Sequence, residues 1–172
     1  MKLFIIGPAG SGKSTLAKKI SLVTKIGSIN LDDIFWKNDV NSFGNIRHEN
    51  ERNMMLDNIL KSRSWILEGA YVEWPRKGME EADQIIYIDL PLKTTSYRII
   101  KRFIKRKLRI EKSNKKETLK NVRELLKWNV KQSEKIHKIV NVMKSEKKKE
   151  IVLIKNNKDM DNIINRYRIE EF

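Results

Sequence analysis

The chain contains no cysteine, and its 172 residues include only 3 prolines and 7 glycines. The absence of cysteine excludes disulfides, zinc sites built on thiolates and cysteine nucleophiles. The sequence has no run of 18 or more apolar residues, so no membrane-spanning helix and no membrane partner are expected. It also lacks an initial basic segment followed by a long apolar stretch and a cleavage site. We therefore predict no signal peptide and take a cytoplasmic location as the default expectation.

Three of the few glycines lie together in the stretch GPAGSGKST, residues 7–15. The stretch matches G-x-x-x-x-G-K-[ST], the P-loop pattern, in which backbone N–H groups wrap a phosphate chain and glycine permits close approach and unusual φ values. Lys13 is expected to reach the β- and γ-phosphates, and the Ser14 hydroxyl to join the oxygen shell of Mg²⁺. We therefore predict ATP and Mg²⁺ as cofactors, with a nucleotide-binding loop made of Gly7, Pro8, Ala9, Gly10, Ser11, Gly12, Lys13, Ser14 and Thr15.

Positive charge is concentrated in one part of the chain. The formal net charge is +15, yet residues 93–149 hold 21 Lys and Arg against 5 Asp and Glu, and the rest of the chain is nearly neutral. Such a segment suits phosphate-bearing substrates, nucleic acid or an anionic surface. For the lysines of residues 112–149, a solvated helical face explains the composition equally well.

Apolar runs alternate with helical patterns along the whole chain, without an internal repeat or a long linker. We predict strands at 2–6, 28–33, 64–70, 84–91 and 150–155, and helices at 13–24, 47–62, 93–109, 117–146 and 158–168. This alternation is typical of an α/β fold with a parallel sheet. The expected architecture is a single domain over residues 1–172, a three-layer P-loop NTPase fold with a five-stranded parallel sheet and a candidate lid at 93–116.

Acidic residues end several of these predicted strands. Ligands of parallel sheets bind beyond the carboxyl ends of the strands, which gathers Asp32, Asp33, Glu68 and Asp89 near the P-loop. Phosphoryl transfer needs Mg²⁺, cations around the phosphoryl group and a carboxylate near the attacking hydroxyl. Either Asp32 or Asp33 can accept that proton. The sequence does not determine their separate roles; as a working assignment, Asp33 accepts the proton and Asp32 joins Ser14 at Mg²⁺. Capping of the next helix is the alternative for one of the two, and Asp89 is expected to form a turn.

Basic residues recur on one face of the helix predicted at 93–109. They are spaced by four, three, one and three residues: Arg98, Arg102, Lys105, Arg106 and Arg109. A row of guanidinium groups over a phosphate site can neutralise charge in the transition state. Arg98 and Arg102 are accordingly candidates for both catalysis and ATP binding.

The segments that follow the second and third strands are candidates for the acceptor site. Trp36 and Lys37 follow the second strand, and Trp74 and Arg76 follow the third. A tryptophan there can stack on a ring of the substrate or belong to the core. The predicted substrate contacts are Asp32, Asp33, Trp36, Glu68 and Arg76. The two histidines, His48 and His137, lack a partner at metal-ligand spacing and are predicted to be non-functional.

Three stretches resemble the bacterial topology modulation proteins, relatives of adenylate kinase: IIGPAGSGKSTLAKKI, INLDDIFWK and WILEGAYVEWPRKGMEEADQIIYIDLPLKTTSYRIIKRFIKR. The resemblance covers nearly all of residues 1–145. It implies a nucleoside-monophosphate-kinase-like P-loop fold, ATP binding and a mobile basic lid with Arg98, Arg102 and Arg106, and it sets the loop of Asn156 and Asn157 against the adenine. The chain departs from the family at Glu68, where Asp is usual, and in an aromatic-rich helix reduced to Trp128.

Together these features predict an ATP- and Mg²⁺-dependent kinase of a small acceptor, such as a nucleotide, a nucleoside or a similar compound. The acceptor is expected near Asp33, Trp36 and Arg76, under the basic helix. The alternative is an ATP-binding regulator that binds nucleic acid through residues 93–149, although the chain has no recognised nucleic-acid-binding signature. An NTPase switch without an acceptor is a third option. The acceptor's identity, the preference for ATP or GTP and the oligomeric state are not determined by the sequence.

Overall fold

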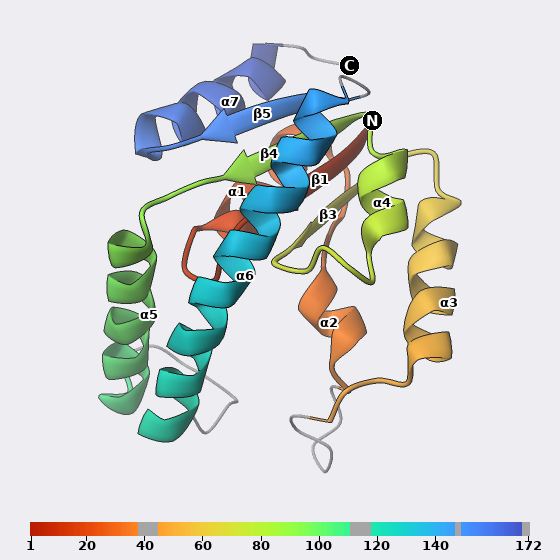
Figure 1. The fold of residues 1–172 in the computed structure, drawn as a ribbon. Coiled ribbons are helices and arrows are strands. Elements are labelled where there is room, and N and C mark those ends of the chain that lie inside the picture. The colour runs from red at the N-terminus through yellow and green to blue at the C-terminus, as the bar shows by residue number, and fades with distance from the viewer. Residues whose placement is uncertain (38–44, 111–117, 147–148, 170–172) are drawn as a thin grey trace.

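The computed structural model describes residues 1–37, 45–110, 118–146 and 149–169. Its centre is a five-stranded, all-parallel sheet in the order β2-β3-β1-β4-β5 (Figure 1). The strands are β1 Lys2–Ile6, β2 Ser28–Asn30, β3 Trp65–Gly69, β4 Gln84–Ile88 and β5 Glu150–Ile154. The helices are α1 Lys13–Thr24, α2 Leu31–Phe35, α3 Glu49–Leu60, α4 Arg76–Glu81, α5 Leu92–Lys107, α6 Leu119–Ser145 and α7 Asn157–Ile169. The predicted α/β class with a five-stranded parallel sheet is confirmed.

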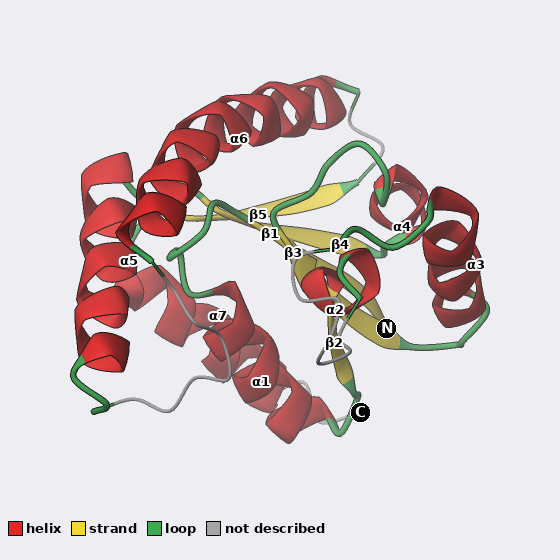
Figure 2. Cartoon of the chain, turned by 90° about the horizontal axis from the view of Figure 1, so that it is seen from below, coloured by secondary structure: helices red, strands yellow, loops and turns green. Residues whose placement is uncertain are grey.

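Helices cover both faces of the sheet, which gives three layers (Figure 2). In the central strand β1, Leu3 and Ile5 pack in the apolar cluster formed with α1 and α7. Phe4 and Ile6 belong to the cluster on the other face, to which α3, α4 and α6 contribute. Successive side chains of a strand point to opposite faces, so a strand covered on both sides is apolar throughout.

Two predicted strands end three residues earlier in the structure than the sequence indicated. β2 stops at Asn30, and Asp32 and Asp33 lie in the first turn of α2 instead of at the end of the strand. The cause is a helix cap, because the Asn30 side chain accepts a hydrogen bond from the Asp32 N–H at 2.8 Å. β4 stops at Ile88, and Pro91 is the N-cap residue of α5. The short helices α2 and α4 were not predicted.

Helix α5 packs through a narrow apolar seam. Ile99 and Phe103 are buried against Val122 of α6. Four other large apolar side chains of this segment face solvent: Tyr97, Ile100, Ile104 and Leu108. No helix in the described part of the chain combines the length and the apolar character that crossing a bilayer requires.

Candidate phosphoryl-transfer site

The P-loop joins the end of β1 to the start of α1. Gly10 and Gly12 have positive φ angles of 77° and 101°, which residues other than glycine rarely adopt. Gly7 serves by its small size, because a Cβ there would lie 2.8 Å from the Ile88 carbonyl oxygen. Gly12 is the N-cap residue of α1 and carries no side chain, so the first N–H groups of the helix are free to meet an anion.

Lys13 and Ser14, the last residues of the P-loop pattern, are each held by a hydrogen bond. The Lys13 Nζ donates to the Pro8 carbonyl oxygen at 2.9 Å. Burial lowers the pKa of Lys13, while the charges of Glu68 and Asp32 act in the opposite direction. The Ser14 Oγ donates to Glu68 Oε1 at 2.6 Å. The predicted lysine and hydroxyl therefore lie together with acids from β3 and α2.

Glu68 lies at the centre of the acidic group. It is 3% exposed and pairs in register with Ile5 of β1 and Asn30 of β2. Burial raises the pKa of Glu68, and the charges of Asp32 and Asp33 raise it further against the opposing effects of Ser14 and Lys13. The charges of Asp32 and Asp33 therefore act on Glu68, although these two residues lie in α2 and not at the end of a strand. Asp89 instead accepts a hydrogen bond from the Tyr87 hydroxyl at 3.0 Å.

The residue after Glu68 determines how closely α2 approaches the sheet. A Cβ on Gly69 would lie 2.8 Å from the Leu31 side chain, so only glycine allows this packing. Asp32, the next residue of α2, accepts a hydrogen bond from the Tyr71 hydroxyl at 2.8 Å. Gly69 and Tyr71 therefore fix the Asp32 carboxylate on the side of α2 that meets β3.

Two arginines of α5 approach the loop. Arg98 Nη1 donates to the Ser11 carbonyl oxygen at 3.2 Å, and its Nη2 donates to Asn157 Oδ1 at 3.2 Å. Arg102 is close enough for its charge to lower the pKa of Lys13, and its buried Nε has no hydrogen-bond partner in the described structure. Lys105 and Arg109 are exposed, so only part of the predicted basic face, Arg98 and Arg102, approaches the loop.

A pocket of about 340 Å³ adjoins the P-loop between α1, α5 and α7. Asn157 lines it, whereas Asn156 uses its Oδ1 to accept the Asp159 N–H at 3.0 Å at the start of α7. Of the two asparagines expected to lie against the adenine, Asn157 is thus the one that lines this pocket. Further lining residues that the sequence did not single out are Lys19, Met160 and Asp161.

Two amide side chains of α6 also reach the site. Asn129 is 1% exposed, accepts the Ala9 N–H at 2.6 Å and donates to the Ala9 carbonyl oxygen at 3.3 Å. Gln132 donates to the Ala70 carbonyl oxygen at 2.6 Å. Helix α6 thereby links the P-loop to the segment that follows Glu68. Sequence reasoning missed both residues; the available signal was two amides, three residues apart, at apolar positions of a helical pattern.

An aromatic cluster lies next to Asp32. The Phe35 and Tyr71 rings stack at 4.6 Å, and Trp36, Trp74 and Trp128 contact them at centroid distances of 5.0 to 6.2 Å. The predicted contact Trp36 belongs to this cluster.

The arginine beside these rings is not the one that the sequence indicated. Arg76 forms an ion pair with Glu80 on the surface of α4 at 2.9 Å. Arg52 of α3 lies over the Phe35 and Trp74 rings instead, at 5.2 and 5.0 Å from the ring centroids. No motif in the sequence marked Arg52.

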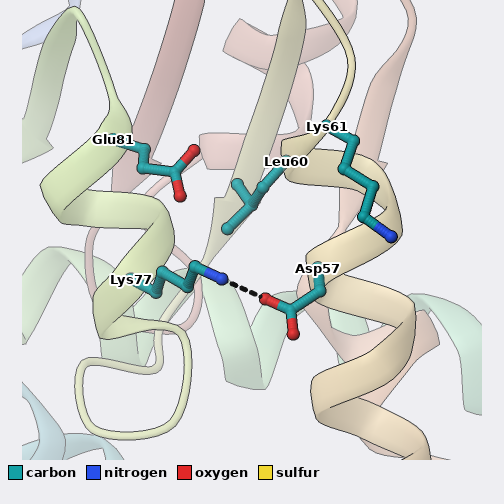
Figure 3. Close-up of a pocket in the computed structure, with 5 residues that line it drawn as sticks. All are labelled: Asp57, Leu60, Lys61, Lys77 and Glu81. Atoms are coloured by element: carbon teal, nitrogen blue, oxygen red, sulfur yellow. Dashed lines mark hydrogen bonds and ion pairs between the residues drawn. The ribbon is translucent and has the colours of Figure 1, made fainter.

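A second pocket, of about 280 Å³, lies between α3 and α4 (Figure 3). Its lining is mostly charged, and the Lys77 Nζ contacts Asp57 Oδ1 at 2.6 Å. It adjoins the end of α3 that leads to the start of β3, opposite the P-loop edge of the sheet. It therefore takes no part in the candidate site.

The comparisons with known proteins support the fold. The chain is similar to an unliganded crystal structure of a sugar kinase from Janibacter sp., with a TM-score of 0.56 and 13% sequence identity, over 95% of this chain and 90% of that one. No protein-family model and no curated protein matches the chain. The likeness to the sugar kinase structure shows a shared α/β fold, and membership of the topology modulation family stays a prediction.

The raised pKa of Glu68 gives a prediction for stability. The folded protein holds a proton on this carboxyl at a higher pH than the unfolded chain does. The contribution of Glu68 to the free energy of unfolding therefore decreases as the pH rises from the ordinary pKa of a glutamate through the raised pKa of Glu68. We expect Glu68→Gln to remove this fall, as measured by urea unfolding between about pH 4 and 8. Glu80→Gln, at an exposed position of α4, is the control. Identical pH dependence in wild type and Glu68→Gln would contradict the prediction.

Proposed function

We propose that the protein is an ATP- and Mg²⁺-dependent phosphotransferase that transfers the γ-phosphoryl group to a small acceptor. The observation that carries this proposal is the convergence of three segments at one edge of the sheet. The P-loop with Lys13, the Glu68 carboxylate bonded to Ser14 and the Arg98 guanidinium bonded to the loop backbone supply the groups that phosphoryl transfer needs.

A nucleoside triphosphate fits the chemistry of the loop. The Ser11 Oγ and the Arg102 Nε are buried and have no hydrogen-bond partner in the described structure. Phosphate oxygens would accept from both, and glycines at 10 and 12 leave the backbone accessible. The pocket beside Gly12, with Asn157 and Met160, offers room for the nucleoside part.

Mg²⁺ would be held by Ser14 together with a carboxylate. The described residues contain no group of three or more His, Asp or Glu side chains suited to holding a metal alone. This agrees with Mg²⁺ sites that use one or two protein oxygens and complete their octahedron with phosphate oxygens and water. Mg²⁺ held there would neutralise charge on the phosphates of the nucleotide. Because Glu68 accepts the Ser14 hydrogen bond, Glu68 would bind Mg²⁺ either directly or through the Ser14 hydroxyl or a water, in addition to the predicted Asp32.

The remaining steps belong to residues of the chain. Asp33, in the first turn of α2, accepts the proton of the attacking hydroxyl, and Tyr71 holds the neighbouring Asp32 in place. Lys13, Arg98 and Arg102 neutralise the charge on the transferred phosphoryl group. Helix α5 closes over the site as part of the lid at 93–116 and excludes water; residues 111–116 of that lid lie outside the described structure.

The proposal is tested by measuring ADP release with ATP and Mg²⁺, first alone and then with nucleosides, nucleoside monophosphates, sugars and sugar acids. We expect one small compound to raise ADP release well above the rate with ATP alone. Short single- and double-stranded DNA forms a second arm, for the alternative that residues 93–149 bind nucleic acid. DNA binding that weakens steeply with salt, without any acceptor that increases turnover, would overturn the kinase proposal.

A further inference from the structure

Two buried hydrogen-bond donors on neighbouring side chains have no acceptor among the described residues. Arg52 Nε and Trp74 Nε1 have no hydrogen-bond partner in the described structure, and the Arg52 guanidinium carbon is 5.0 Å from the Trp74 ring centroid. A guanidinium and an indole N–H can only donate. The group that would satisfy them must therefore present acceptor oxygens.

Arg52 differs from the other arginine in this region. Arg47 forms an ion pair with Glu51 at 2.5 Å and donates to the Ile34 carbonyl oxygen at 3.0 Å, so its charge is used within the fold. No carboxylate of the described residues forms an ion pair with Arg52. Stacking on aromatic rings compensates only part of the cost of a partly desolvated cation.

The position of Arg52 connects it to the acidic group. Its guanidinium lies over the Phe35 ring, Phe35 stacks on Tyr71, and Tyr71 donates to the Asp32 carboxylate. Helices α2 and α3, which carry Asp32 and Arg52, are in contact (Figure 1). The two donors therefore lie on the side of the site proposed for the acceptor substrate, and the Phe35 and Tyr71 rings separate Arg52 from Asp32.

We propose that Arg52 and Trp74 bind an anionic group of the acceptor, so that the acceptor carries a carboxylate or a phosphate in addition to the oxygen that is phosphorylated. This inference rests on the proposed function. The forked guanidinium matches the two oxygens of such a group, and the neighbouring rings pack against the apolar part of the same molecule. Neutral sugars and free nucleosides carry acceptor oxygens but no negative charge to balance the guanidinium.

The anion site is tested first by binding, independently of turnover. Inorganic phosphate and acetate are titrated into the protein in saturating ADP and Mg²⁺, which occupy the P-loop, while tryptophan emission is recorded. We expect a saturable change that Arg52→Gln weakens by about tenfold or more. Arg52→Lys keeps the positive charge but loses the forked arrangement of N–H donors. Its affinity for the anions is therefore expected to lie between those of wild type and Arg52→Gln. Arg63→Gln, at an exposed position near the start of β3, is expected to bind as wild type does.

Turnover with matched acceptor pairs gives the second test. Each pair differs only in the anionic group, as a nucleoside and its monophosphate or a sugar and its sugar acid do. We expect only anionic members to raise ADP release, with an acceptor KM that Arg52→Gln increases at least tenfold and an unchanged KM for ATP. The phosphate and carboxylate arms decide which anion is used.

The two proposals fail in different ways. Equal phosphate and acetate titrations in wild type and Arg52→Gln, or equal turnover of neutral and anionic partners, would overturn the anion site. Normal anion binding without any acceptor that raises ADP release would instead overturn the proposed kinase function.

Discussion

Lys13→Ala is expected to lower kcat/KM for ATP-dependent turnover by about 100- to 1,000-fold, because under the proposed function it removes a cation that neutralises the transferred phosphoryl group. Lys13 is the buried lysine of the P-loop, and burial already lowers its pKa. A buried cation costs free energy of desolvation, so its removal is not expected to unfold the protein. The measurement is steady-state ADP release together with thermal unfolding of the same variant.

Lys18→Ala is the matched control, because Lys18 is an exposed lysine on the same helix, α1. It is expected to leave both turnover and stability unchanged. If Lys13→Ala retained the wild-type rate, the P-loop would not be the nucleotide site. If it lost activity only because it had unfolded, the thermal transition would reveal this.

Gly10→Ala is expected to reduce both stability and turnover, because two independent constraints act at this position. The φ angle of 77° costs an L-residue about 1–2 kcal/mol. The new Cβ would also lie 2.6 Å from the Thr95 carbonyl oxygen of α5, so helix and loop must move apart. That movement displaces Arg98, which contacts the loop from the same helix. We expect the free energy of unfolding to fall by at least about 1 kcal/mol and kcat to fall with it.

Gly27→Ala is the control for this prediction. No heavy atom lies within 4 Å of a Cβ at Gly27, and its φ angle is not positive. The change is expected to be close to neutral in urea unfolding and in ADP release. Equal stability of Gly10→Ala and Gly27→Ala would show that the P-loop and α5 are not in close contact.

Helix α6 holds the P-loop in place beside the acidic residues. Asn129 holds both backbone groups of Ala9, and Gln132 holds the chain just after Glu68. Because these bonds are made by buried side chains, they fix the P-loop relative to the acids that the proposed reaction uses. Pre-organisation of this kind is how a site of charged groups stabilises a transition state without rearranging.

The elements of the fold could be predicted from the sequence because their signals are local. Apolar runs buried on both faces correctly indicated β1, β3 and β4, whereas β2 and β5 at the two edges of the sheet are only partly buried. The P-loop is also local, since its glycines, Lys13 and Ser14 lie within eight consecutive residues. The ends of the elements were less predictable, because the cap at Asn30 competes with extension of β2.

The pairing of distant residues was decided by the tertiary structure alone. Ser14 meets Glu68 across 54 positions, and Ala9 meets Asn129 across 120. The same is true of Arg52, which lies over rings from α2 and from the segment after β3, whereas the arginine nearest those rings in sequence, Arg76, pairs on the surface. Hydrophobic periodicity determines which face of an element is buried, but not which polar side chain of another element lies opposite it. That depends on how the elements are packed around the sheet.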